Sequence, residues 1–110
     1  TLDASTTAYT TSGETTNTSG SAYVAGGQAL SNVNPTTSGT TAFTDFADEV
    51  WTTASFTARG AMIYNTTPAH TYTNPSVLIL DFGSDKTASA GDFTVIFPTA
   101  DASNAILRIA

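Results

Sequence analysis

Apolar residues recur at every second position in several short stretches of the chain, which is the period of a β-strand. No stretch shows the longer period of an amphipathic helix. Glycine, proline, asparagine and serine separate the stretches at hairpin spacing. The pattern predicts about six strands, at residues 23–33 (a short pair that turns at Gly26-Gly27), 40–46, 54–65, 76–82, 92–98 and 105–110.

Two of these stretches also predict what packs against them. In residues 54–65, Phe56 and Tyr64 are expected on the same face, and Gly60 in mid-strand predicts a bulge or a close approach by another element. Residues 76–82 are almost continuously apolar, which is typical of a central strand covered on both faces.

Turn-forming residues and charges interrupt the alternating pattern between these stretches. A turn or loop is therefore predicted wherever such residues cluster. The predicted interruptions are residues 34–39, 47–51, 65–75, 83–91 and 99–104.

The amino-acid composition favours the same fold class. Threonine and serine number 23 and 11 of the 110 residues, and charged residues make up only 11%. Threonine favours strands, and serine favours turns. Residues 1–22 have few apolar side chains, so we expect a flexible or extended N-terminal arm, with an ordinary loop as the alternative, followed by a single domain over residues 23–110. The expected fold is all-β, an antiparallel β-sandwich or jelly-roll-like domain with an extended Thr/Ser-rich N-terminal arm.

The net charge of -6 disfavours partners that are bound through phosphate groups. We therefore expect no nucleic-acid binding and no attachment to anionic membranes. The chain has no cysteine, which excludes disulfides, thiolate metal sites and cysteine nucleophiles. A hydroxyl-rich surface with few charges is typical of extracellular or particle-surface proteins.

An acidic cluster, Asp45, Asp48 and Glu49, is the densest group of chemically active residues. Three nearby carboxylates could bind calcium, although the spacing is not that of an EF-hand. Asp48 or Glu49 could also face Asp81 or Asp92 as a carboxylate pair for glycoside hydrolysis. A solvated loop before a buried Trp51 is the favoured interpretation.

Asp81-Phe82-Gly83 matches the triplet that holds magnesium in protein kinases. The other kinase signatures, a glycine-rich loop and a catalytic-loop aspartate, are missing. The triplet therefore predicts a strand that ends in a turn.

Other polar residues give weaker signals. His70 is the only histidine and lies in a predicted loop, so an exposed position is favoured over a catalytic triad. Arg59 and Arg108 lie in predicted strands, where an arginine usually covers a sheet edge or pairs with a carboxylate. Asn17 and Asn65 begin glycosylation patterns that a threonine-rich chain produces by chance. We therefore predict no catalytic, cofactor-binding or metal-binding residues.

Aromatic residues offer one further function. Several could form a sugar-binding platform, although filling the core is the favoured role of the tryptophan. The candidates are Tyr9, Tyr23, Trp51, Tyr64 and Tyr72.

Five segments together carry a resemblance that spans nearly the whole chain. They read TLDASTTAYTTSGE, YVAGGQALSNV, FADEVWTTASFTARGAMIYN, LDFGSDKTASAGDFTVIFP and NAILRIA. In this order they resemble a family of small tailed-bacteriophage virion-associated structural proteins, mostly without assigned activity. Members usually start further upstream, so we expect the chain to be a trimmed or partly ordered product.

The resemblance implies a non-enzymatic virion structural protein without cofactors. Its expected partners are other virion proteins, either capsid or tail subunits, together with copies of itself in a homo-oligomer. A capsid decoration or cement protein is the leading hypothesis. The alternative is a receptor- or glycan-binding module on a phage tail or fibre.

Overall fold

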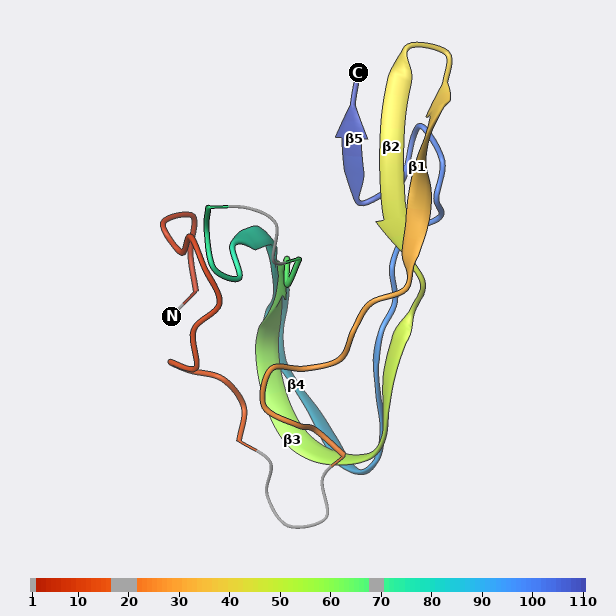
Figure 1. The fold of residues 1–110 in the computed structure, drawn as a ribbon. Helices are drawn as coiled ribbons and strands as arrows, with labels where there is room; N and C mark the ends of the chain where they lie inside the picture. The colour runs from red at the N-terminus through yellow and green to blue at the C-terminus, as the bar shows by residue number, and fades with distance from the viewer. Residues whose placement is uncertain (1, 17–21, 68–70) are drawn as a thin grey trace.

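A computed structural model describes residues 2–16, 22–67 and 71–110, and all regular structure in these ranges is β-strand. The strands form two antiparallel sheets, which confirms the all-β prediction (Figure 1). A three-stranded sheet has the order β1-β2-β5, and β3 and β4 form a long two-stranded ribbon. The strands are β1 (Asn32–Ser38), β2 (Thr41–Phe46), β3 (Glu49–Tyr64), β4 (Ser76–Val95) and β5 (Leu107–Ile109).

The β3–β4 ribbon bends sharply near its middle (Figure 1). The strand pairing shifts register on both sides of Ala54, first with an extra residue in β3 and then with one in β4. Thr53 and Ala90 have φ angles of 54° and 50°, in a region that non-glycine residues seldom adopt. The Ala90 N–H donates to the Ser55 hydroxyl at 2.9 Å. Two opposed bulges therefore turn the ribbon and give it a concave face.

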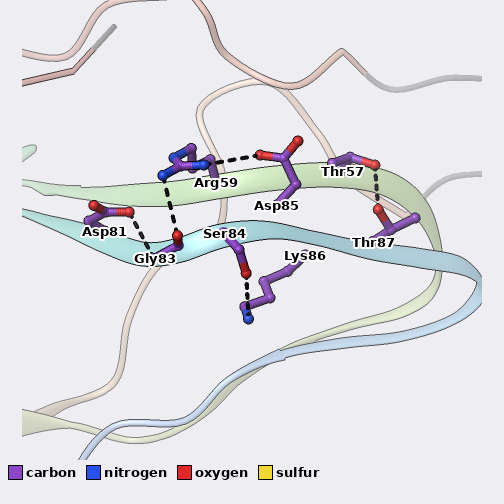
Figure 2. A network of polar contacts seen from close by, with 8 residues as sticks. All are labelled: Thr57, Arg59, Asp81, Gly83, Ser84, Asp85, Lys86 and Thr87. Carbon is purple, nitrogen blue, oxygen red and sulfur yellow. Dashed lines mark hydrogen bonds and ion pairs between the residues drawn. The ribbon is translucent and has the colours of Figure 1, made fainter.

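A larger bulge replaces the turn that was predicted at residues 83–91. The whole segment lies within β4, where residues 82–85 stand opposite Arg59 alone. The Asp81 carboxylate accepts a hydrogen bond from the Gly83 N–H at 2.8 Å, and Gly83 has a φ of 77° (Figure 2). The local turn chemistry is present, but the chain continues in the same strand because β3 provides its partner. The stretch at 76–82 and the first part of the stretch at 92–98 consequently belong to one strand, which ends at Val95.

The loop predicted at residues 34–39 is also wrong, because β1 covers most of it. Pro35 is tolerated because β1 is an edge strand and its pairing shifts between Val33 and Thr36. The interruption predicted at residues 47–51 is shorter than expected, since β3 already begins at Glu49.

The strand pair predicted at residues 23–33 does not form, because residues 22–31 contain no strand. The turn itself is confirmed. The Gly27 N–H donates to the Val24 carbonyl at 2.9 Å, and Gly26 and Gly27 have φ angles of 93° and 77°.

The hydrophobic core is thin for a chain of this length. The small sheet meets one end of the ribbon, where the rings of Phe46 and Phe97 lie 5.5 Å apart. At the same joint, the Asp48 carboxylate accepts a hydrogen bond from the Phe97 N–H at 2.8 Å. The buried apolar residues are Phe43, Ala54, Phe56, Ile63, Phe97 and Ala105.

The predicted bulge at Gly60 is confirmed, and it yields a test of the fold. A Cβ on Gly60 would collide with the backbone oxygen of Leu80. We expect Gly60→Ala to lower the free energy of unfolding by about 1–3 kcal/mol, because β4 would have to shift. Gly91→Ala is the matched control, since its nearest neighbour would lie 3.8 Å away. Urea denaturation measures both, and equal effects would contradict the close approach.

Candidate interaction site

The concave face of the ribbon and the N-terminal segments enclose an open cavity of about 940 Å³. Both limbs of the bent ribbon line this cavity, which we call the trough. Its walls include residues 9, 10, 12–15 and 26–30. Six of the large apolar residues that line it are called the floor below, and they are Trp51, Phe56, Met62, Leu80, Phe82 and Phe93.

Aromatic rings from distant parts of the ribbon meet on this floor. The ring centroids of Phe56 and Phe93 are 4.6 Å apart, and Trp51 and Phe82 each lie 6.3 Å from Phe93. Edge-on and tilted contacts of this kind favour association beyond the area that they bury. The bend brings these rings together, since Trp51 and Phe56 lie on either side of it.

The floor also explains the role of the Asp81-Phe82-Gly83 triplet. Phe82 lines the trough, while the Asp81 carboxylate accepts the hydrogen bond from Gly83 that shapes the bulge. Gly83 supplies the positive φ that this shape requires. Each residue of the triplet thus has a structural role in placing an aromatic ring on the floor.

A carboxylate in the N-terminal segment ties three parts of the chain together. The two oxygens of Glu14 accept hydrogen bonds from the Tyr9 hydroxyl at 2.7 Å, the Tyr23 hydroxyl at 2.7 Å and the Gly26 N–H at 2.6 Å. The Tyr64 hydroxyl donates to the Gly26 carbonyl at 2.7 Å, which adds β3 to the group. These residues are called the Glu14 cluster below.

The environment of this cluster shifts the pKa of its members. Burial alone would raise the pKa of Glu14, but the hydrogen bonds from Gly26, Tyr23 and Tyr9 together lower it. The hydrogen bond to Glu14 raises the pKa of Tyr9 to about 12. Burial and the Glu14 carboxylate raise the pKa of Tyr23. Glu14 is therefore ionised, and both phenols are neutral donors, around neutral pH.

The N-terminal segment also reaches the far end of the ribbon. The Tyr9 N–H donates to the Asn74 carbonyl at 2.9 Å, and the Ser76 N–H donates to the Thr7 carbonyl at 3.0 Å. The rings of Tyr9 and Tyr64 stack with their centroids 4.6 Å apart. The segment is thus held by backbone bonds, one stacked pair and Glu14.

Glu14 was missed by the sequence analysis, although a signal was present. It is the only charged residue between Asp3 and Asp45. A single carboxylate in a long uncharged stretch has no neighbouring cation, so backbone and hydroxyl donors are its natural partners.

The acidic cluster at residues 45–49 does not form a solvated loop. Asp45 lies in β2, is fully buried and accepts hydrogen bonds from the N–H groups of Phe46 at 2.8 Å and Ile106 at 3.1 Å. Asp48 accepts from Phe97, as described above, and Glu49 lines the trough. Within residues 2–16, 22–67 and 71–110, no group of histidine, cysteine or acidic residues is arranged to hold a metal ion.

The carboxylates considered for glycoside hydrolysis lie far apart along the ribbon. Glu49 pairs with Val95 at one end, whereas Asp81 pairs with Gly60, beyond the bend. Asp92 is exposed and lies near the bend. Glu49 and Asp81 both line the trough, but they do so from different limbs and the strand pairing does not make them neighbours.

Both strand arginines have partners. Arg59 forms an exposed ion pair with Asp85 at 3.9 Å and donates to the Gly83 carbonyl at 3.2 Å (Figure 2). Such exposed pairs contribute little to stability. Arg108 donates to the Ser103 carbonyl at 2.6 Å and so braces the predicted turn before β5.

Most of the predicted aromatic platform converges on the trough, whose walls and floor include Tyr9, Tyr23, Trp51 and Tyr64. Tyr72 lies apart and is 74% exposed. Among the described residues, the Trp51 Nε1 atom is buried without a hydrogen-bond partner.

Of His70 and the two glycosylation patterns, only the pattern at Asn65 lies within the residues that the structure describes. His70 and the Asn17 pattern lie outside the described residues. Asn65 is exposed, and its side chain accepts a hydrogen bond from the Thr67 N–H at 2.8 Å.

The Glu14 cluster predicts a specific pH dependence. Because the pKa of folded Glu14 lies below its ordinary value of 4.5, its ionised form stabilises the fold above that value. This contribution is lost as the pH falls through the lowered pKa. At pH 7 we expect Glu14→Gln to lower the free energy of unfolding by about 1–3 kcal/mol. Urea denaturation should show this gap narrowing as the pH falls below 4.5.

Glu49→Gln is the control for this measurement, since no hydrogen bond to the Glu49 side chain occurs in the described part of the chain. We expect its stability curve to run parallel to that of the wild type. A gap for Glu14→Gln that stays constant with pH would contradict the role of the ionised carboxylate.

Asp45 provides a second test of the carboxylates. Asp45→Ala would leave the N–H groups of Phe46 and Ile106 without their acceptor. We expect a loss of about 2–4 kcal/mol in the free energy of unfolding. Asp92→Ala, at an exposed site, should change it by less than about 0.5 kcal/mol. Thermal and urea denaturation measure both, and a mild effect of Asp45→Ala would rule out a structural role.

The comparisons with known proteins leave the trough as the main clue to function. No helix among the described residues is long and apolar enough to cross a membrane. No family model, curated protein or solved structure matches the chain.

Proposed function

We propose that the protein is a non-enzymatic structural component of a bacteriophage virion, and specifically a capsid decoration protein that acts by packing against other subunits. The observation that carries this proposal is an excess of surface. A folded monomer of 11.3 kDa is expected to expose about 5,700 Å², whereas this chain exposes 7064 Å². The difference, about 1,300 Å², exceeds what one partner buries in a standard protein interface.

The shape of the chain supports the same proposal. Its radius of gyration is 15.0 Å, whereas about 13 Å is expected for a compact domain of 110 residues. Large apolar side chains stay exposed, among them Ile96 at 76% and Val24 at 67%. A subunit that is completed by its neighbours has these properties, because the missing burial is supplied on assembly.

The carboxylates support a non-enzymatic role. Glu14, Asp45 and Asp48 all accept hydrogen bonds from backbone N–H groups of distant segments. Carboxylates that hold the backbone in this way are not free to transfer protons to a substrate.

The proposal also assigns roles to the two sheets and to the N-terminal residues. We infer that the two antiparallel sheets serve as a sandwich-like or jelly-roll-like unit in the particle, and that residues 1–22 act as an arm. The support for the arm is its mode of attachment. Residues 7–9 bind the ribbon mainly through backbone hydrogen bonds, which an equivalent neighbouring subunit could also supply.

Location on the particle is the direct test. Gold-labelled antibody against the chain, applied to intact phage particles, should decorate the head when viewed by electron microscopy. Label confined to the tail would favour a tail protein instead. Particles without label would overturn the virion assignment, and empty heads treated with purified protein serve as the positive control.

A receptor- or glycan-binding module is the second candidate, and two observations favour it. Four of the five predicted platform aromatics line the trough, and Tyr72 is exposed on the loop between β3 and β4. The stacking of Tyr9 on Tyr64 counts against it, because it occupies ring faces that a sugar would need. Binding on a glycan array that Trp51→Ala abolishes would favour this candidate.

A further inference from the structure

We propose that the trough is the docking site for a second copy of this chain, and that the part which docks is a ridge formed by Val50 and Ile96. This inference rests on the proposed function, and it identifies the partner and the two surfaces that meet. The trough and the ridge lie on opposite faces of the same limb of the ribbon.

Strand alternation places the ridge. Trp51 and Phe93 pair with each other and line the trough. Their neighbours along the strands therefore point to the opposite face, where Val50 pairs with Thr94. Ile96 lies one residue beyond the end of β4 and two residues after Thr94. Val50 is 40% exposed and Ile96 is 76% exposed. Two branched apolar side chains thus project from the convex side of the bend.

The large exposed surface area of the chain favours a second copy as the partner. The excess of about 1,300 Å² over a folded monomer compares with about 800 Å² that each partner buries in a standard interface. Burial of this surface would stabilise a chain with so thin a core, and a second copy is present wherever the chain itself is present. Association favours the folded chain in this way because it removes exposed apolar surface.

Charge also favours a second copy at these two surfaces. Each copy carries a net charge of -6, so a contact through acidic side chains would be repulsive. The six floor residues and the two ridge residues are uncharged, whereas Glu14, Glu49, Arg59 and Asp81 also line the trough. Because the ridge adds no charge, its contact with the floor does not place an acidic side chain of one copy against those of the other.

The arrangement of the two surfaces sets the type of assembly. A ridge and a trough are different surfaces, so each copy offers one of each and the contact is heterologous. Repetition of such a contact closes into a ring when the rotation between copies permits. We therefore expect a cyclic oligomer with more than two subunits.

The single tryptophan makes the trough observable. We expect sedimentation velocity of the full chain to show an oligomer that dissociates on dilution. Over the same range of concentration, Trp51 emission should shift to longer wavelength as the trough opens to water. Ile96→Asp and Val50→Asp should each weaken self-association on the order of 100-fold, since each would place an unpaired charge in an apolar contact.

Tyr72→Asp is the matched control, because Tyr72 is 74% exposed and lies outside both surfaces. It should associate like the wild type, and circular dichroism should show that all three variants keep the wild-type fold. A wild type that stays monomeric overturns the inference. So does tight association of the two ridge variants, or an emission that is unchanged on dissociation.

The two proposals fail in different experiments. Gold label on particles together with a monomer in solution would overturn docking in the trough and leave the virion proposal standing. Concentration-dependent association that is lost in Ile96→Asp, without label on any particle, would overturn the virion proposal alone.

Discussion

Two paired strands have two faces to cover, and a ribbon of this kind cannot remain stable in water by itself. The chain meets this constraint by bending the β3–β4 ribbon at Thr53 and Ala90, so that both limbs contribute to one concave face. Trp51, from one limb, then contacts the ring of Phe56 from the other limb. The trough, the convex ridge and the path of the N-terminal segment all depend on this bend.

The N-terminal segments cover the concave face only in part, and polar contacts fix them there. Glu14 has most of this role, because its two oxygens collect donors from its own segment, from Tyr23 and from Gly26. Asp48 has a similar role at the joint between the small sheet and the ribbon, and Asp45 has one within the small sheet. The chain has 9 acidic and only 3 basic residues, so few basic side chains are available to pair with the carboxylates. Backbone N–H groups are therefore their main partners.

The same construction links structure to proposed function. A thin core, an elongated shape and exposed apolar side chains would be a disadvantage for a protein that acts alone. They are expected of a subunit whose burial is completed by assembly. Because the important carboxylates hold the backbone, the apolar surfaces rather than reactive groups are the most informative features of this molecule.

The sequence by itself determined the all-β class, the strands at residues 41–46 and 54–64, and the bulge at Gly60. These features depend on alternation and on glycine, which are local properties of the chain. Only the tertiary structure decided that residues 83–91 continue in β4, because a turn signal such as Asp81-Phe82-Gly83 becomes a bulge when a long partner strand lies alongside. Likewise, the contact of Glu14 with Gly26 and the contact of Trp51 with Phe56 depend on a bend that two opposed bulges produce. The positions of these bulges follow from the register between β3 and β4, and neither strand's sequence determines that register by itself.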